Sequence, residues 1–178
     1  GTKEALKLPV KHSYSVTIIQ QEQPFALNTW QVLPFETYHD AAQPVGYLLA
    51  STTGMKLLYA TDTHFIGQRF RGVTHLMIEA NYCEDILAQN IAAKAVHPRL
   101  ANRLYDTHLN LRRVKEFLMT GNWEQLQEIH LLHLSHQNAD PEAFKREIQR
   151  LTGLPVYIAG EIAATGQFEK GPEVRRFG

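Results

Sequence analysis

The first third of the chain alternates short apolar runs with turn residues, a pattern typical of β-strands. These runs predict four strands, over residues 13–19, 29–33, 46–50 and 56–59. Thr52, Thr53 and Gly54 separate the last two, and glycine supplies the positive φ angle that a tight hairpin turn requires. This part of the sequence therefore predicts an antiparallel meander.

In the rest of the chain, apolar runs alternate with stretches whose apolar residues recur every three to four positions, which predicts alternating strands and helices. We expect strands over 75–79, 128–133 and 156–158, and a helix over 84–94. A second helix is expected between the N-cap Asn110 and Gly121. A third is expected between the N-cap Asp140, with Pro141 at its first position, and Gly153.

Strand–helix–strand order implies parallel pairing at this edge of the sheet. Each predicted helix is apolar on one side only. We therefore expect an α/β (α+β) fold with a mixed sheet and helices on its outer face. The chain is short of strands to cover the opposite face, which predicts either a homo-oligomer formed through that face or a missing covering segment. Residues 1–160 are interpreted as one partial domain and 161–178 as an extended C-terminal tail.

Composition narrows the classes of protein. Eighteen basic and eighteen acidic residues give no net charge, so no global field attracts nucleic acid or an anionic membrane. No stretch approaches the ~20 apolar residues that span a bilayer, and the N-terminus has no apolar signal-peptide core. The single cysteine, Cys83, excludes an internal disulfide. We predict a cytoplasmic protein without membrane association.

Nine histidines are present, and several of them, with aspartates, follow the predicted strands or lie in the segments between elements. Four places carry such residues at predicted strand ends: His39 and Asp40, Asp62 and His64, Asp106 and His108, and His133 and His136. Imidazole and carboxylate groups are the usual ligands of zinc and similar divalent ions. No local motif such as HExxH accompanies them, so other interpretations stay open: Asp62 as a turn residue, His39 as a loop histidine bonded to Asp40, and His133 as a core histidine.

Several segments of the chain resemble one family in the same order. Residues 34–49, containing His39, are similar to the segment around the third metal-binding motif of metallo-β-lactamase-fold phosphodiesterases of the YycJ-like and PhnP-like branch. Residues 57–63 resemble the family's strand that ends in its metal-bridging aspartate, and residues 76–81 its next strand. Residues 106–110 and 131–135 resemble its last two histidine sites.

The resemblance implies roles for five residues. His39, Asp62 and His133 would be metal ligands, with Asp62 bridging two ions. His108 would lie near the leaving oxygen as a proton donor or phosphate ligand, and Asp40 would support a ligand without touching the metal. The cofactor would be a divalent metal, zinc or alternatively manganese, and the substrate a phosphodiester, with nucleic acid among the candidates.

One departure from the family is specific. The HxHxDH motif, which lies N-terminal to these segments in the family, occurs nowhere in this sequence. The chain therefore resembles part of an αββα sandwich cut downstream of its main metal motif, and we expect it to be inactive alone. The rival hypothesis is a non-catalytic binding or assembly module that retains the fold without a complete metal site.

Overall fold

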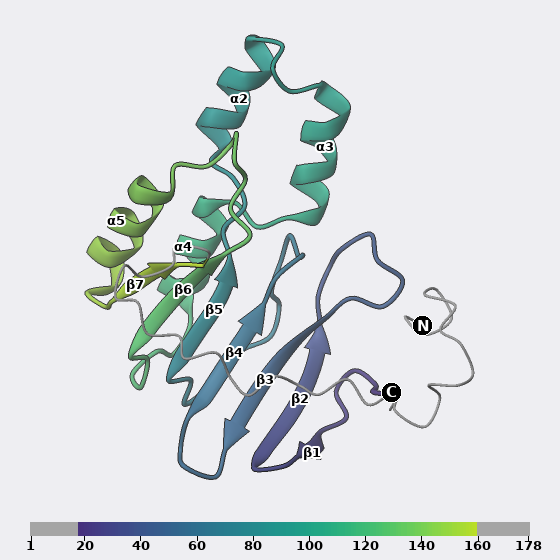
Figure 1. The fold of residues 1–178 in the computed structure, drawn as a ribbon, viewed down its shortest axis with the longest axis vertical. Coiled ribbons are helices and arrows are strands. Elements are labelled where there is room, and N and C mark those ends of the chain that lie inside the picture. Colours follow the sequence, from purple (N-terminus) through teal and green to yellow (C-terminus); the bar gives the residue numbers. More distant parts are fainter. Residues whose placement is uncertain (1–17, 160–178) are drawn as a thin grey trace, which may run out of the picture.

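The computed structural model describes residues 18–159, which form a mixed seven-stranded sheet and four helices (Figure 1). The strands follow one another across the sheet in chain order. They are β1 (Phe25–Leu27), β2 (Trp30–Glu36), β3 (Val45–Ser51), β4 (Lys56–Ala60), β5 (His75–Glu79), β6 (Glu128–Leu132) and β7 (Val156–Ile158). The helices are α2 (Glu84–Ala92), α3 (Pro98–Thr107), α4 (Leu111–Thr120) and α5 (Pro141–Thr152).

The antiparallel part of the sheet, β1 to β4, confirms the last three strands of the predicted meander, which are β2, β3 and β4. The turn between β3 and β4 contains Gly54 at φ +92°, a conformation that glycine adopts without steric cost. The strand predicted over residues 13–19 is not confirmed, because residues 18 and 19 belong to no strand and residues 13–17 lie outside the described part of the chain.

Strand β1 was not predicted. It has only three residues, of which two are exposed, so it shows no apolar alternation. Its pairing with β2 depends on the intervening turn, where Asn28 adopts φ +53°. Asparagine tolerates this left-handed conformation better than most residues do. The turn, rather than burial, therefore defines this edge strand.

The parallel part, β4 to β7, confirms the pairing expected from strand–helix–strand order. Helix α4 begins after Asn110, whose side chain accepts a hydrogen bond from the backbone N–H of Arg113. Helix α5 begins after Asp140, which caps it in the same way, and ends at Gly153 with φ +70°. Both helices have the bounds that their capping residues predicted.

Helix α3 was not predicted, and it corrects the placement of His108. Its N-cap is His97, whose ring nitrogen Nδ1 accepts from the backbone N–H of Arg99, so the usual Ser, Thr, Asp or Asn signal is missing. Pro98 occupies the first turn. Because α3 ends at Thr107, His108 follows a helix and not a strand, and the expectation of a strand end at this position was wrong.

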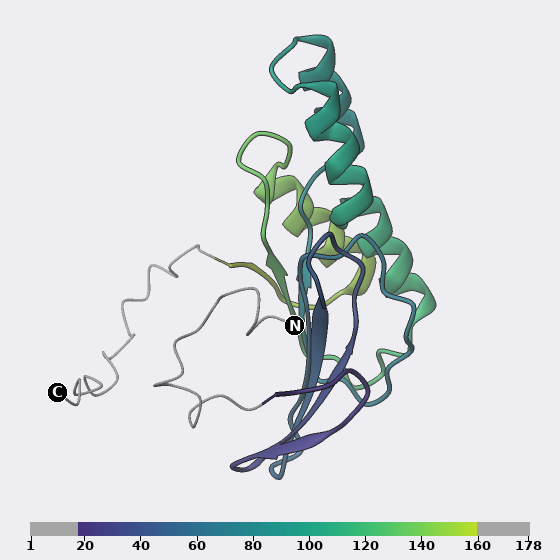
Figure 2. The ribbon, with the colours of Figure 1, turned by 90° about the vertical axis from the view of Figure 1, so that its right-hand side faces the viewer.

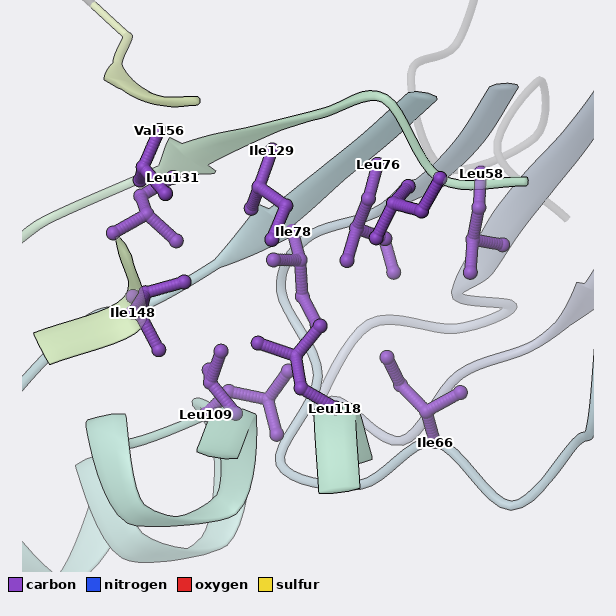
Figure 3. Packing of buried hydrophobic residues seen from close by; sticks show 14 of the residues in the cluster. Leu58, Ile66, Leu76, Ile78, Leu109, Leu118, Ile129, Leu131, Ile148 and Val156 are labelled. Atoms are coloured by element: carbon purple, nitrogen blue, oxygen red, sulfur yellow. The ribbon is translucent and has the colours of Figure 1, made fainter. Parts of the chain in front are cut away.

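The main core lies between the sheet and helices α4 and α5 (Figure 3). Alternate residues of the central strands point into it, including Leu58, Leu76, Ile78, Ile129 and Leu131, and all five are fully buried. Burying one such side chain contributes about 1.5–3 kcal/mol. The helices lie on one side of the sheet (Figure 2). Among residues 18–159 no helix covers the other face.

Helices α2 and α3 project beyond the C-terminal ends of the parallel strands (Figure 1). They have a small core of their own, formed by Tyr82, Leu87, Val96 and Ala101. No helix within residues 18–159 is long and apolar enough to cross a membrane. The predicted tail, residues 161–178, lies outside the described residues.

Candidate metal centre

Three adjacent parallel strands bring acidic and imidazole side chains to one edge of the sheet. Asp62 lies two residues beyond β4, Glu79 is the last residue of β5, and His133 follows β6 directly. Strands β4, β5 and β6 are neighbours and run in the same direction, so their C-terminal ends converge. His108 joins them from the connection between α3 and α4, which is held by a hydrogen bond from the backbone N–H of Asn81 to the carbonyl oxygen of Leu109.

Glu79 is the centre of this group and its side chain is fully buried. Its Oε1 lies 2.6 Å from Nδ1 of His108 and 2.8 Å from Nδ1 of His133. Its Oε2 accepts hydrogen bonds from the backbone N–H groups of Thr63, at 3.1 Å, and Leu109, at 3.4 Å. Burial by itself would raise the pKa of Glu79, but the hydrogen bonds from the two histidines outweigh it, so the pKa is lowered. Glu79 is thus a buried, ionised carboxylate.

The contacts with Glu79 orient both imidazole rings. When Nδ1–H of a neutral histidine donates to a carboxylate, the lone pair of Nε2 is left for a metal ion, an arrangement common among metal-binding histidines. The hydrogen bond to Glu79 also raises the pKa of His133, although partial burial opposes this. A proton and a metal ion would therefore compete for His133.

Asp62 completes a set of four potential ligands. Its Oδ1 lies 3.0 Å from Nδ1 of His133 and 3.8 Å from Nδ1 of His108. Asp62, Glu79, His108 and His133 each offer a ligand atom, and these atoms lie within 4.8 Å of one another. A donor set of two carboxylates and two imidazoles suits zinc or manganese. This group could therefore hold a divalent metal ion.

Two members of this group have an unusual backbone conformation. Asp62 has φ +51° and His133 has φ +54°. Residues other than glycine rarely adopt this left-handed region, and such strain is concentrated at functional sites. At His133 the strained residue is held by a 2.8 Å hydrogen bond from Nδ2 of Asn81 to its carbonyl oxygen. Two potential ligands thus lie in the left-handed region, which aspartate and histidine tolerate better than most residues do.

His39 and Asp40 lie beside this group but not within it. The ring of His39 is 5.3 Å from that of His108, centroid to centroid. Nδ1 of His39 lies 2.9 Å from Oδ1 of Asp40, but without hydrogen-bond geometry, so this buried nitrogen has no hydrogen-bond partner among the described residues. Asp40 instead accepts a 2.9 Å hydrogen bond from Nε of Arg103 on α3, which lowers the pKa of Asp40.

The structure thus brings Asp62, His108 and His133 together. It places the ring of His39 against that of His108, outside the group. It does not place His64 or His136 in the group. The residue that sequence reasoning missed as a site residue is Glu79. A signal existed, because a single carboxylate ends the otherwise apolar run from Leu76 to Ile78, and an acidic residue at the buried end of such a strand needs partners.

Comparisons with known proteins address the fold. No family model matches the sequence, and no curated protein matches it. Among solved structures, the chain is similar to the metallo-β-lactamase fold protein YhfI from Bacillus subtilis, with a TM-score of 0.56 and 14% identity over 84% of this chain and 58% of that one. It is also similar to a diphosphatase from the PhnP family, with a TM-score of 0.52 and 16% identity over 89% of this chain and 52% of that one.

A mutant of the CmlA β-hydroxylase is similar over a smaller share of its length, with a TM-score of 0.50 and 12% identity over 78% of this chain and 31% of that one. The chain thus spans little more than half the length of YhfI and of the diphosphatase. At these identities the similarity concerns the fold. With its mixed sheet and helices on one face, this chain has the metallo-β-lactamase fold over the part that it shares with them.

Proposed function

We propose that this chain is part of a metal-dependent hydrolase that cleaves phosphoric esters, with phosphodiesters as the substrate class. The observation that carries the proposal is the group of Asp62, Glu79, His108 and His133, with ligand atoms within 4.8 Å of one another at the C-terminal edge of the sheet. The PhnP-family neighbour is a diphosphatase by name, which supports a phosphorus-centred substrate.

The residues of the group have separable roles in this proposal. A divalent ion at the group would supply Lewis-acid stabilisation of negative charge on the substrate. Asp62 and His133 would hold the ion, and Glu79 would keep His133 oriented through the 2.8 Å contact with its Nδ1. His39 would be a further ligand through its partly buried imidazole, whose buried Nδ1 lacks a hydrogen-bond partner among residues 18–159.

His108 is suited to proton transfer. Its Nδ1 is held 2.6 Å from Oε1 of Glu79, and this contact fixes the orientation of the ring. His108 also lies just before the N-terminus of α4, where the helix dipole favours an anion such as a phosphate group. We therefore assign His108 to the leaving oxygen or to a phosphate oxygen of the substrate.

Metal binding tests the proposal directly. The full chain is stripped with a chelator and dialysed against zinc or manganese, and bound metal is measured by mass spectrometry. We expect stoichiometric metal in the wild type and a loss of at least tenfold in affinity for Asp62→Asn. The matched control is Asp106→Asn, because Asp106 is an exposed aspartate on α3 outside the group. Equal metal content in all three proteins, or none in the wild type, contradicts the proposal.

The alternative function is a binding or assembly module without catalysis, which the absence of an HxHxDH motif from this sequence favours. Hydrolysis of bis-p-nitrophenyl phosphate by this chain and by any longer natural form separates the two functions. A hydrolase gives metal-dependent turnover in the longer form, and His108→Ala reduces that turnover while metal content stays unchanged. A module that has lost its chemistry binds no stoichiometric metal in either form.

A further inference from the structure

Two histidines and one glutamate lie together on the open face of the sheet, which is the face that no helix of residues 18–159 covers (Figure 2). Glu128 and His130 are two residues apart on β6, and His75 on β5 pairs directly with Glu128. Their neighbours in the sequence, Leu76 and Ile129, are fully buried under the helices, so the three side chains point the other way. All three are partly exposed, by 21% to 32%. We call them the open-face cluster.

One oxygen atom is the centre of the open-face cluster. Oε1 of Glu128 lies 2.9 Å from Nε2 of His130 and 3.8 Å from Nε2 of His75. Both imidazole rings thus direct the same kind of nitrogen atom toward one carboxylate. Two imidazoles and one carboxylate are a ligand set that zinc sites with three protein ligands use. The chemistry of the open-face cluster therefore suits a divalent metal ion.

Neighbouring side chains hold both imidazole rings. Nδ1 of His75 lies 2.8 Å from the hydroxyl oxygen of Thr74, which also accepts a hydrogen bond from the backbone N–H of Lys56. The ring of His130 stacks on that of Tyr157 on β7, 5.0 Å away centroid to centroid and inclined by 27°. Metal-binding histidines nearly always bond a second polar group through the other ring nitrogen. His75 has this arrangement, because its Nδ1 contacts a hydroxyl group while its Nε2 is directed at Glu128.

The distances within the open-face cluster are close to those that a metal ion requires. A tetrahedral ion with bonds of about 2.0–2.2 Å separates its ligand atoms by roughly 3.3–3.6 Å. The two distances to Oε1 of Glu128, 2.9 and 3.8 Å, bracket this value. The three ligand atoms are together spaced more widely than those of the strand-end group, which lie within 4.8 Å of one another. An ion would therefore draw the two Nε2 atoms together, and partly exposed side chains can rotate in this way.

We propose that His75, Glu128 and His130 form a second site for a divalent transition-metal ion, of which zinc is the common example, with water completing the coordination. The site is distinct from the strand-end group. His75 is the first residue of β5 and Glu79 is the last, so the two groups lie about 13 Å apart along that strand. A bound ion joins β5 to β6 through side chains and stabilises the folded chain according to its affinity.

The test uses the full chain with the double substitution Asp62→Asn and His133→Asn, which removes strand-end ligands and keeps residues that tolerate the left-handed backbone there. Zinc is titrated by calorimetry near neutral pH, and we expect one ion per chain. His75→Gln and His130→Gln, each added to this background, should weaken zinc binding at least about tenfold, because even partners outside the ligand shell contribute that much. The matched control is His136→Gln, which removes an exposed histidine that belongs to neither group and should leave the affinity unchanged.

A second measurement needs no substitution, and it decides if circular dichroism shows that the background variant is unfolded. Zinc is added to the wild-type chain, and nitrogen-15 NMR follows the Nε2 signals of His75 and His130, because coordination shifts the signal of the bound nitrogen. We expect both signals to shift together.

Three results overturn the second site: no zinc bound by the folded background variant, an affinity that is unchanged in His75→Gln and His130→Gln or equally reduced in His136→Gln, or unshifted Nε2 signals. None of them bears on the strand-end group, whose ligands are absent from the background. Conversely, the metal measurements on the strand-end group are made cleanly with His130→Gln, which removes the second site.

Discussion

The two faces of strands β4, β5 and β6 consist of alternate residues in the same short segments, yet they differ in burial and in chemistry. Ile78 and Ile129 point toward the helices and are fully buried, whereas Met77 and His130, each one residue away, are only partly buried. Glu79, the next residue after Ile78, is on the opposite face and is fully buried by the loops that carry the candidate ligands. One face therefore stabilises the sheet, and the end of the other face carries the candidate ligands.

The largest effect should come from truncating a side chain on the helix-covered face. Ile78→Ala removes buried methyl groups and leaves a cavity, so it should lower the free energy of unfolding by about 2–5 kcal/mol. Met77→Ala, on the neighbouring residue of the open face, should lower it by less than about 1 kcal/mol. Urea unfolding of both variants measures the difference. Equal losses of unfolding free energy in the two variants would show that the open face is buried to the same extent as the helix-covered face.

The next effect concerns the buried carboxylate. Glu79→Gln removes the charge that accepts from His108 and His133, and hydrogen bonds to charged groups are worth about 1.5–3 kcal/mol. We expect a loss of that size in the free energy of unfolding of the metal-free protein. Glu147→Gln is the matched control, because the Glu147 side chain is 42% exposed in an ion pair with Lys115 and should contribute no more than about 1 kcal/mol. A variant of Glu79 that is as stable as the control would contradict a central role for this carboxylate.

A smaller effect is expected for self-association. We propose that two copies of the chain associate through the open face of the sheet, which includes Met77 and the 46% exposed Tyr157. Met77→Lys should weaken the dimer by about tenfold, or roughly 1.4 kcal/mol, because association would bury an unpaired ammonium group. Met119→Lys, on the 62% exposed Met119 of α4, is the control. Sedimentation velocity that finds only monomer at all concentrations would exclude this association.

The smallest effect is a pH dependence of the free energy of unfolding, which we expect to arise at His133. The pKa of His133 is raised from its ordinary value of 6.5, chiefly by the hydrogen bond to Glu79. A raised pKa in the folded state contributes stability that is fully present below pH 6.5 and is lost as the pH rises through the folded value. The contribution is small, because the side chain is 49% exposed and solvent screens it.

In the metal-free protein, we therefore expect the wild type to lose more stability than His133→Asn between pH 6 and pH 9. Urea unfolding in the presence of a chelator measures both proteins across this range. Parallel pH profiles of the two proteins would show that His133 is not coupled to Glu79 in solution.

The fold could be predicted where local signals agree with burial. Asn110, Asp140 and Gly153 place helix ends correctly, because capping is a local interaction. Helix α3 and strand β1 were not predicted, because neither has the usual local signal. A histidine caps the helix, and the strand depends on pairing with β2 instead of on its own apolar pattern.

The candidate site could be predicted only in part, because its geometry depends on contacts between distant segments. The resemblance indicated His39, Asp62, His108 and His133, and the structure brings the last three together while His39 lies beside the group. The central position of Glu79 follows from its contacts with residues 29 and 54 positions later in the chain, which no local pattern encodes. The link from Asp40 to Arg103 likewise depends on a helix that the sequence did not reveal.

The left-handed backbone at Asp62 and His133 has a consequence for how this chain can diverge. Both positions accept aspartate, asparagine, histidine or glycine more readily than β-branched or bulky residues. A descendant that loses the candidate metal centre while keeping its shape is therefore expected to substitute asparagine or glycine there, and not valine or leucine. Such substitutions at positions 62 and 133 would be a readable trace of lost chemistry in a lineage whose architecture is unchanged.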